Sequence, residues 1–383
     1  MDSDVKTKII NRVLFCTSPL QVVNARSAMD YLNSDNNCRD FVVIIHPLLL
    51  DSTKDLIKDL AKKMNYEEVF DLSDLVKIHT LSNLSFAKKI LNFKAIVFNS
   101  VNQYEVSYKH IYSALMDKIG NIDILFFRMN YDHVDSLFIN SQKNSYKIGI
   151  EDGIGDYVPK YWYLLRINFY EIRHKLKSIL RSYSFFLFSI FFTRSLKISL
   201  QMFIKPNNNF KDSYTNIETK KSIYIGEHFK KNINLLLEQD YQNKIGIIII
   251  GTLLDSRFKF NIVREVQIYN KLIKMLSEKY DITPEEIWYK PHPRLLKKDW
   301  EFMKNKLDCS VYSLSFHTIA EVELLNKNLR AIYSVSSSTL LYAKKLFDID
   351  SYLIDIRKEG CHPSSYKKAY YLAKKFDIKI IKI

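Results

Sequence analysis

Short apolar runs separated by helical stretches constrain the fold of this chain more than any other feature of its sequence. They occur at residues 12–16, 41–45, 94–98, 122–127, 146–150, 244–251, 286–290, 331–335 and 351–355. Strands that alternate with helices are typical of βαβ units and a parallel sheet. A chain of 383 residues is too long for one typical core and suits two domains. We therefore predict an α/β protein with two Rossmann-like domains that face each other across a cleft.

A loop rich in proline and asparagine separates the two series of runs. The segment Pro206–Asn209 carries the clearest loop signal in the chain. We place the N-terminal domain at residues 1–215 and the C-terminal domain at residues 216–383. The first domain contains a basic, aromatic and helical insertion at residues 161–205.

Three short polar motifs follow apolar runs where strands are expected to end. In chain order they are Glu151-Asp152-Gly153, Lys290-Pro291-His292-Pro293-Arg294 and Ser336-Ser337-Ser338-Thr339. In open α/β sheets the ligand crevice lies outside the carboxyl ends of the strands. Three such motifs in one chain therefore predict a single site assembled from distant segments.

The histidine motif holds its imidazole between two prolines. Pro291 and Pro293 restrict the backbone on either side of His292 and prevent a helix from absorbing it. With Arg294 nearby, the imidazole suits a group that donates a hydrogen bond or a proton to a leaving phosphate. The alternative interpretation is a structural histidine in a tight turn.

The serine motif follows one expected strand and opens an expected helix. Helix N-termini bind phosphate through free backbone N–H groups and the positive end of the helix dipole. The hydroxyls of the motif add donors, and we expect Ser337 and Ser338 to be the main phosphate ligands. The alternative is an ordinary helix cap, which needs only one of the four residues.

Several carboxylates are candidates for a general base. Strand alternation allows only one of Glu151 and Asp152 to point into the cleft, where it could accept a proton from a hydroxyl. The alternatives are a metal ligand, which no second acidic cluster supports, and a polar turn. Asp255 follows Gly251 and Thr252 at the end of another strand and is a second candidate base.

A further acid lies between the histidine and serine motifs. Glu321 falls on an expected helix at residues 318–325. A carboxylate at that place could accept hydrogen bonds from ribose hydroxyls. The alternative is a solvated helix face.

The chain carries a strong excess of positive charge. The 57 Lys and Arg residues against 42 Asp and Glu residues give a formal net charge of +15. Such an excess suits a nucleotide, an anionic glycan, a membrane surface or nucleic acid as partner, and the alternative is a generic basic surface. Because the sequence contains no recognised nucleic-acid module, we expect no nucleic acid as partner.

Residues 161–205 combine a cluster of aromatics with eight basic residues and a single acid, Glu171. The apolar centre of the segment, residues 185–192, is too short for a spanning helix, which needs about 20 apolar residues. Basic flanks around aromatics suit a helix that lies in the interface of an anionic membrane. A buried helix hairpin and a homodimer contact are the alternatives.

Cysteine usage and the first residues indicate a cytoplasmic protein, and residues 161–205 suit a peripheral position at the inner face of the cell membrane. The four cysteines include no CxxC pair, so we expect reduced thiols and neither disulfides nor a zinc site: Cys16, Cys38, Cys309 and Cys361. Residues 1–8 are polar and lead directly into a strand, so we expect no secretory signal.

The order of the motifs resembles that of bacterial sialyltransferases. An acidic pair with glycine, then Lys-Pro-His-Pro, then a run of Ser and Thr is similar to their motif set. The segment Leu14–Gln21 is similar to the start of glycosyltransferase family 52, which includes lipooligosaccharide and capsule sialyltransferases. Bacterial polysialyltransferases of family 38 carry a similar set. The resemblance extends over residues 12–356, and residues 157–240 show no match within it.

The resemblance implies a GT-B-like fold, a CMP-sialic acid donor, inversion at the anomeric carbon, and neither a metal nor another cofactor. The first domain is then the acceptor side, and the second binds the CMP-sugar. His292 matches the histidine that assists departure of the CMP phosphate, and Glu321 matches a ribose-binding glutamate. The remaining substrate-binding residues that we expect are Lys290, Pro293, Arg294, Ser336, Ser337, Ser338, Thr339, Gly251, Thr252 and Gly153.

Three carboxylates match the bases of different families. Asp255 matches that of family 52, although the segment Gly251–Asp255 departs from the family's turn by one residue. Glu151 matches the base of polysialyltransferases, and Asp152 matches that of another sialyltransferase family.

We therefore predict an inverting, metal-independent sialyltransferase. It would transfer sialic acid from CMP-Neu5Ac to a terminal galactose, in α-2,3 linkage, of a surface glycan such as lipooligosaccharide or capsule. One alternative is a polysialyltransferase that extends a sialylated chain through α-2,8 or α-2,9 linkages. A second is a non-catalytic protein that binds nucleotides or nucleic acid.

Overall fold

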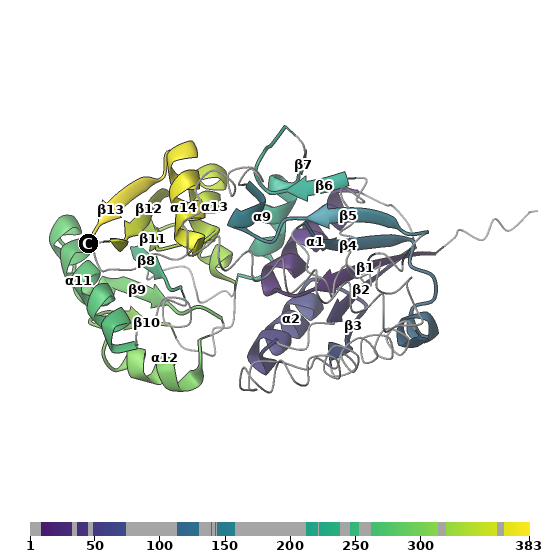
Figure 1. The fold of residues 1–383 in the computed structure, drawn as a ribbon, viewed down its shortest axis with the longest axis horizontal. Helices are drawn as coiled ribbons and strands as arrows, with labels where there is room; N and C mark the ends of the chain where they lie inside the picture. The colour runs from purple at the N-terminus through teal and green to yellow at the C-terminus, as the bar shows by residue number, and fades with distance from the viewer. Residues whose placement is uncertain are drawn as a thin grey trace, which may run out of the picture.

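Two parallel β-sheets, one in each half of the chain, form the framework of the computed structural model (Figure 1). It describes residues 9–32, 37–44, 49–73, 113–129, 139, 142, 144–157, 212–220, 222–237, 246–252, 262–293, 295–312, 319–357 and 364–383. All pairings between the named strands are parallel, as the alternation of strands and helices predicts.

The first sheet has the strand order β3-β2-β1-β4-β5-β6-β7. Its strands are β1 (Ile10–Cys16), β2 (Cys38–Ile44), β3 (Glu68–Asp71), β4 (Ile124–Arg128), β5 (Tyr146–Ile150), β6 (Asp212–Thr215) and β7 (Ile223–Tyr224). The named helices of this half are α1 (Pro19–Tyr31), α2 (Asp51–Lys63), the 3₁₀ helix η3 (Ile154–Tyr157) and α9 (Gly226–Asn234). The strand order reverses between β1 and β4, so their carboxyl ends form the switch point at which such sheets bind ligands.

Helix α1 begins directly after Ser18, and a serine followed by proline is typical of a helix start. Ser18 has an extended backbone with φ −149°, and Pro19 occupies the first turn of the helix. The side-chain Oε1 of Gln21 accepts hydrogen bonds from the backbone N–H groups of Thr17 at 2.7 Å and Ser18 at 3.3 Å. This capping fixes the turn that follows β1, directly at the switch point.

The second sheet has the order β10-β9-β8-β11-β12-β13. Its strands are β8 (Ile247–Ile250), β9 (Ile287–Lys290), β10 (Ser310–Val311), β11 (Ala331–Ser334), β12 (Asp350–Asp355) and β13 (Lys379–Lys382). Its helices are α11 (Ile262–Tyr280), α12 (Lys297–Lys304), α13 (Thr339–Leu346), α14 (Ser364–Lys375) and the 3₁₀ helices η5 (Pro284–Glu286) and η6 (Ala320–Leu325). The order reverses between β8 and β11, which places a second switch point at the ends of these strands.

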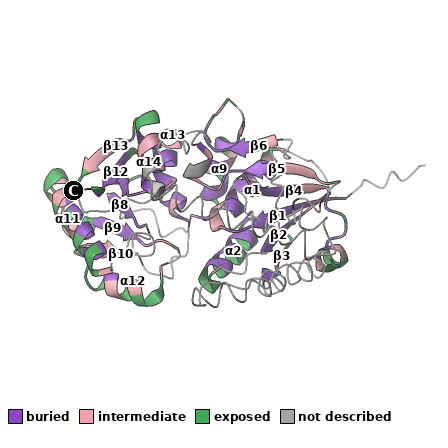
Figure 2. Ribbon diagram, in the orientation of Figure 1, coloured by how far each residue is buried: buried purple, intermediate pink, exposed green. Residues whose placement is uncertain are grey.

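The cores consist of strands that are covered on both faces. The four isoleucines of β8 are all buried, as expected for a central strand of a parallel sheet. Figure 2 shows buried residues along the strands of both sheets and exposed residues on the outer sides of α11 and α12. The prediction of an α/β protein with two Rossmann-like domains is confirmed by the two parallel sheets.

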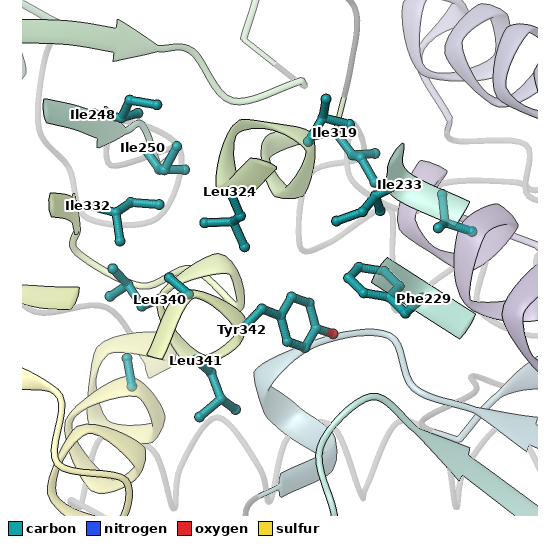
Figure 3. Packing of buried hydrophobic residues seen from close by; sticks show 14 of the residues in the cluster. Phe229, Ile233, Ile248, Ile250, Ile319, Leu324, Ile332, Leu340, Leu341 and Tyr342 are labelled. Carbon is teal, nitrogen blue, oxygen red and sulfur yellow. The ribbon is translucent and has the colours of Figure 1, made fainter. Parts of the chain in front are cut away.

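Helix α9 packs against both halves. The side-chain amide of Asn232 donates hydrogen bonds to Ser27 Oγ at 3.2 Å and Asp30 Oδ2 at 2.8 Å on α1. On the other side, the ring of Phe229 lies 5.4 Å from that of Tyr342 on α13 (Figure 3). Strand β7 and helix α9 follow residue 215 in the sequence, and β7 still pairs with β6 in the first sheet. The domain boundary at residue 215 stays a prediction.

Some predicted features lie outside the described residues, namely the strand at 94–98 and the basic aromatic segment at 161–205. The helix expected at 318–325 is the 3₁₀ helix η6. Within the described ranges, no helix combines the length and the apolar character needed to cross a membrane.

Candidate active site

The polar motifs lie at the carboxyl ends of strands in both sheets. In the first half, Ser18 follows β1, Arg128 ends β4 and the acidic motif follows β5. In the second half, Gly251 follows β8, the histidine motif starts at the end of β9 and the serine motif follows β11. Since parallel strands end at the same edge of a sheet, each half gathers its candidate residues at its switch point.

Glu151 is fully buried. Its Oε2 accepts hydrogen bonds from the backbone N–H of Asn216 at 2.6 Å and from the hydroxyl of Tyr157. Its Oε1 is buried without a hydrogen-bond partner among the described residues. Burial raises the pKa of Glu151 to about 8, and the nearby carboxylates of Asp156 and Glu321 act in the same direction. Among the described residues, Glu151 thus keeps one acceptor oxygen without a hydrogen bond, and its pKa lies near the range in which a general base operates.

Asp152 has a different environment, and its side chain is 23% exposed. Its Oδ1 accepts hydrogen bonds from Ser18 Oγ at 2.8 Å and Gln21 Nε2 at 2.6 Å, and Arg128 Nη1 lies 3.9 Å from its Oδ2. The Asp152 side chain therefore ties the acidic motif to the start of α1. Its backbone N–H donates to Asp156 Oδ2 at 2.7 Å, and burial raises the pKa of Asp156 to about 7.

Gly153 brings the acidic motif to the second half of the chain. A Cβ atom built on Gly153 would lie 3.9 Å from both Cβ and Oγ of Ser338. The structure therefore brings the acidic motif and the serine motif together, although 185 positions (338 − 153) separate them in the sequence.

The serine motif is joined to Glu321 of η6. Thr339 Oγ1 donates to Glu321 Oε1 at 3.0 Å, and Ser338 Oγ lies 3.5 Å from the same oxygen. Ser337 Oγ lies 2.8 Å from Thr339 Oγ1 and accepts from the backbone N–H of Thr339 at 3.2 Å. Ser336, Ser337 and Ser338 stay partly exposed, whereas Thr339 and Glu321 are buried. A solvated helix face for Glu321 is thereby excluded, and burial raises its pKa.

The histidine motif forms a turn after β9. The backbone carbonyl of His292 accepts a hydrogen bond from Leu295 N–H at 2.9 Å, and the histidine itself is partly exposed. Pro293 is exposed, and Arg294 lies outside the described residues. Lys290 is buried, and its Nζ lies 2.6 Å from Glu323 Oε1. The ammonium of Lys290, which we expected to bind substrate, is thus paired with the carboxylate of Glu323 in the protein itself.

The turn after β8 packs closely against β9. Gly251 N–H donates to the backbone carbonyl of Lys290 at 2.8 Å, and a Cβ on Gly251 would come within 2.3 Å of the Tyr289 hydroxyl oxygen. Only glycine fits this position. Thr252 is partly exposed, with a buried hydroxyl, while Asp255 lies outside the described residues.

Sequence reasoning missed the residues that surround the motifs. They are Ser18 and Gln21 beside Asp152, Tyr157 and Asn216 beside Glu151, and Glu323 and Tyr312 beside Lys290. The Ser18–Gln21 spacing is a capping signal, but it gives no indication of a carboxylate partner. In the part of the chain that the structure describes, no group of three His, Cys, Asp or Glu side chains could hold a metal ion.

Comparison with known proteins identifies one family. The family model described as alpha-2,8-polysialyltransferase (POLYST) matches residues 12–355. No sequence among the curated proteins matches the chain.

Several solved structures are similar over nearly the whole chain. A 2,6-sialyltransferase of Photobacterium sp. JT-ISH-224, in complex with CMP and lactose, has a TM-score of 0.45 and 10% identity, covering 97% of this chain and 78% of that one. A sialyltransferase of Photobacterium damsela has a TM-score of 0.44 and 12% identity, covering 98% and 81%. The calicheamicin glycosyltransferase CalG4 has a TM-score of 0.47 and 8% identity, covering 98% and 86%. At TM-scores below 0.5, none of these likenesses adds to the assignment.

Proposed function

Because the chain belongs to the alpha-2,8-polysialyltransferase family, it is a sialyltransferase, and we propose that it transfers sialic acid from CMP-sialic acid to a sialylated glycan. The acceptor is then the sialic acid at the end of a capsular or other surface chain, and the new linkage is α-2,8. The excess of positive charge, +15 for the chain, suits both an anionic donor and an anionic acceptor. Family membership favours this enzyme over the non-catalytic alternative.

The close approach of Gly153 to Ser338 carries this proposal, because it brings together a candidate base and a candidate phosphate site that follow strands of two different sheets. The hydroxyls of Ser337 and Ser338 would bind the phosphate of the donor. The Glu321 carboxylate, held by Thr339, would accept hydrogen bonds from the ribose.

The chemistry is a displacement at the anomeric carbon. The acceptor oxygen forms a bond to that carbon while the bond from the carbon to the CMP phosphate oxygen breaks. Glu151 takes the proton of the acceptor hydroxyl, and His292 donates a hydrogen bond or a proton to the departing phosphate. Attack from the side opposite the phosphate inverts the anomeric centre. No metal takes part in these steps.

A second candidate acceptor is a terminal galactose, joined in α-2,3 linkage. The similarity of Leu14–Gln21 to the start of family 52 favours it, and Ser18 and Gln21 of that segment contact Asp152 in the structure. The donor and the chemistry stay the same, and only the acceptor differs.

Release of CMP from CMP-Neu5Ac, measured with EDTA present, tests the proposal with lactose and with a sialylated oligosaccharide as acceptors. Transfer only to the sialylated acceptor supports the polysialyltransferase. Transfer to lactose favours the galactose acceptor, and activity that EDTA abolishes contradicts metal independence. No release with either acceptor would overturn the donor assignment.

A further inference from the structure

A buried cluster of Lys290, Glu323 and Tyr312 lies beneath the histidine motif. Lys290 Nζ is 2.6 Å from Glu323 Oε1, and the Tyr312 hydroxyl donates to Glu323 Oε2 at 2.9 Å. The lysine ammonium also lies 4.8 Å from the centre of the Tyr312 ring. All three residues are at least nine-tenths buried. The cluster joins the end of β9 and the residue after β10 to the helix η6.

The two carboxylates of η6 contact different motifs. Glu321 accepts hydrogen bonds from the serine motif at the start of α13, and its partner Thr339 lies 3.0 Å away. Glu323, two residues further on, contacts Lys290 at the start of the histidine motif. One short helix therefore sets the distance between the segment that carries His292 and the segment that carries the serine hydroxyls.

The position of Lys290 is fixed from both sides. Its backbone carbonyl accepts a hydrogen bond from Gly251 N–H at 2.8 Å, while its ammonium is held by Glu323. His292 is only two residues further along the chain. The ammonium of Lys290 also attracts the carboxylate of Glu321. Without Glu323, the ammonium would therefore be drawn toward Glu321 and would shift the Glu321 side chain.

A buried ion pair contributes little net stability, because desolvation offsets the attraction between the charges. Apolar residues of similar volume would therefore support the fold equally well. We propose that Glu323, with Lys290 and Tyr312, acts as a positioning cluster that fixes His292 and Glu321 relative to the nucleotide of the donor. This inference rests on the proposed CMP-sialic acid donor and assigns no direct contact with substrate to the cluster.

Two variants separate a positioning role from a structural one. The double variant Lys290→Met/Glu323→Leu replaces the ion pair with apolar side chains and should keep the thermal unfolding temperature near that of the wild type. Glu323→Gln keeps the shape of the side chain and removes its charge. The matched control is Glu67→Gln, which removes a carboxylate from an exposed ion pair with Arg39 on the first sheet.

We expect the KM for CMP-Neu5Ac to rise at least about tenfold in both cluster variants, a change equal to about 1.4 kcal/mol of binding. Binding of CMP, measured by calorimetry, should weaken in parallel, while Glu67→Gln leaves both values unchanged. Reversible unfolding would itself weaken apparent binding in proportion to the folded fraction. Both values are therefore measured well below the unfolding temperature of each variant, where the folded state predominates.

Wild-type KM and CMP affinity in folded Glu323→Gln or in the folded double variant would overturn the positioning role. A wild-type protein that turns over no CMP-Neu5Ac would instead overturn the proposed function, and the two failures are distinct. If the double variant does not fold, Glu323→Gln decides the question by the same two measurements.

Discussion

Gly153 and Ser338 lie close together although they follow strands of different sheets, β5 and β11. A Cβ atom on Gly153 would be 3.9 Å from the Cβ and the Oγ of Ser338. Gly153 also has a φ of +134°, a backbone conformation that L side chains rarely adopt. The turn that brings the acidic motif to the serine motif thus requires glycine for its backbone.

We expect Gly153→Ala to destabilise the protein by about 1–3 kcal/mol, because alanine is strained at this φ. Turnover should fall as well, because the turn that carries Glu151 and Asp152 must shift. Gly120→Ala is the control, since Gly120 has a φ of +76° and no atom near its Cβ position. Chemical denaturation and CMP release, measured on both variants, check the expectation. Equal turnover per folded molecule in the two variants would contradict a role for the Gly153 turn in the site.

His292→Ala should reduce turnover by about two orders of magnitude or more, because the departing phosphate loses a hydrogen-bond or proton donor. The effect should appear in kcat, since the charge on the phosphate develops in the transition state. His228→Ala is the matched control: that residue is also partly exposed but lies on α9, with its ring 5.8 Å from Tyr31. Steady-state CMP release gives both values. Near-normal turnover in folded His292→Ala would remove this residue from the mechanism.

Local patterns were sufficient to predict the elements that carry the site. Four consecutive isoleucines predict β8, and Ser18 followed by Pro19 predicts the start of α1, because both signals act within a few residues. The order of strands has no such local signal. That β1 pairs with β4, for example, depends on contacts between residues more than 100 positions apart (Arg12 with Ile124).

The same limit applies to the choice between the two acids. Sequence alternation shows that Glu151 and Asp152 face different sides, but not which side is buried. The answer depends on Asn216, 65 residues away, which contacts Glu151, and on Ser18, 134 residues away, which contacts Asp152. Glu321 could be placed between two motifs from the sequence, whereas its partner Thr339 could be identified only from the packing of η6 on α13.

Residues 161–205 should bind anionic membranes, although they lie outside the described residues. Each basic residue near an anionic surface contributes about 1 kcal/mol, and the attraction weakens with salt. We expect flotation with vesicles that contain phosphatidylglycerol, and little with pure phosphatidylcholine. Replacing Arg181 and Arg194 by Gln should reduce the bound fraction. Absence of binding to both kinds of vesicle would favour a buried hairpin or a homodimer contact.

The loss of turnover on substitution should show which of the three candidate carboxylates acts as the general base. We expect Glu151→Gln to lower turnover by about two to four orders of magnitude, as for a lost general base. Asp152→Asn should cost roughly tenfold, because its carboxylate orders Ser18 and Gln21 and takes no proton. Asp255→Asn should have the smallest effect. CMP release with a sialylated acceptor gives the three rates, and a different ranking would move the role of base to the residue whose loss costs most.

The raised pKa of Glu151 predicts opposite effects of pH on stability and on turnover. Burial raises this pKa to about 8, so the folded protein keeps a proton that the unfolded chain releases above its ordinary pKa of 4.5. The contribution of Glu151 to stability is therefore fully present below the ordinary pKa and is lost as the pH rises toward about 8, by about 1.4 kcal/mol per pH unit. Turnover should increase over the upper part of this range, because only the carboxylate accepts a proton.

Rate and unfolding measurements between about pH 6 and about pH 9 check this expectation. The Glu151→Gln protein should lose less stability than the wild type as the pH rises. In Asp156→Asn, the midpoint of the rate profile should move to lower pH, because a negative charge that raises the pKa of Glu151 is removed. An unchanged midpoint in that variant, together with an unchanged stability profile in Glu151→Gln, would mean that another group controls the rate. The pH dependence would then no longer support Glu151 as the base.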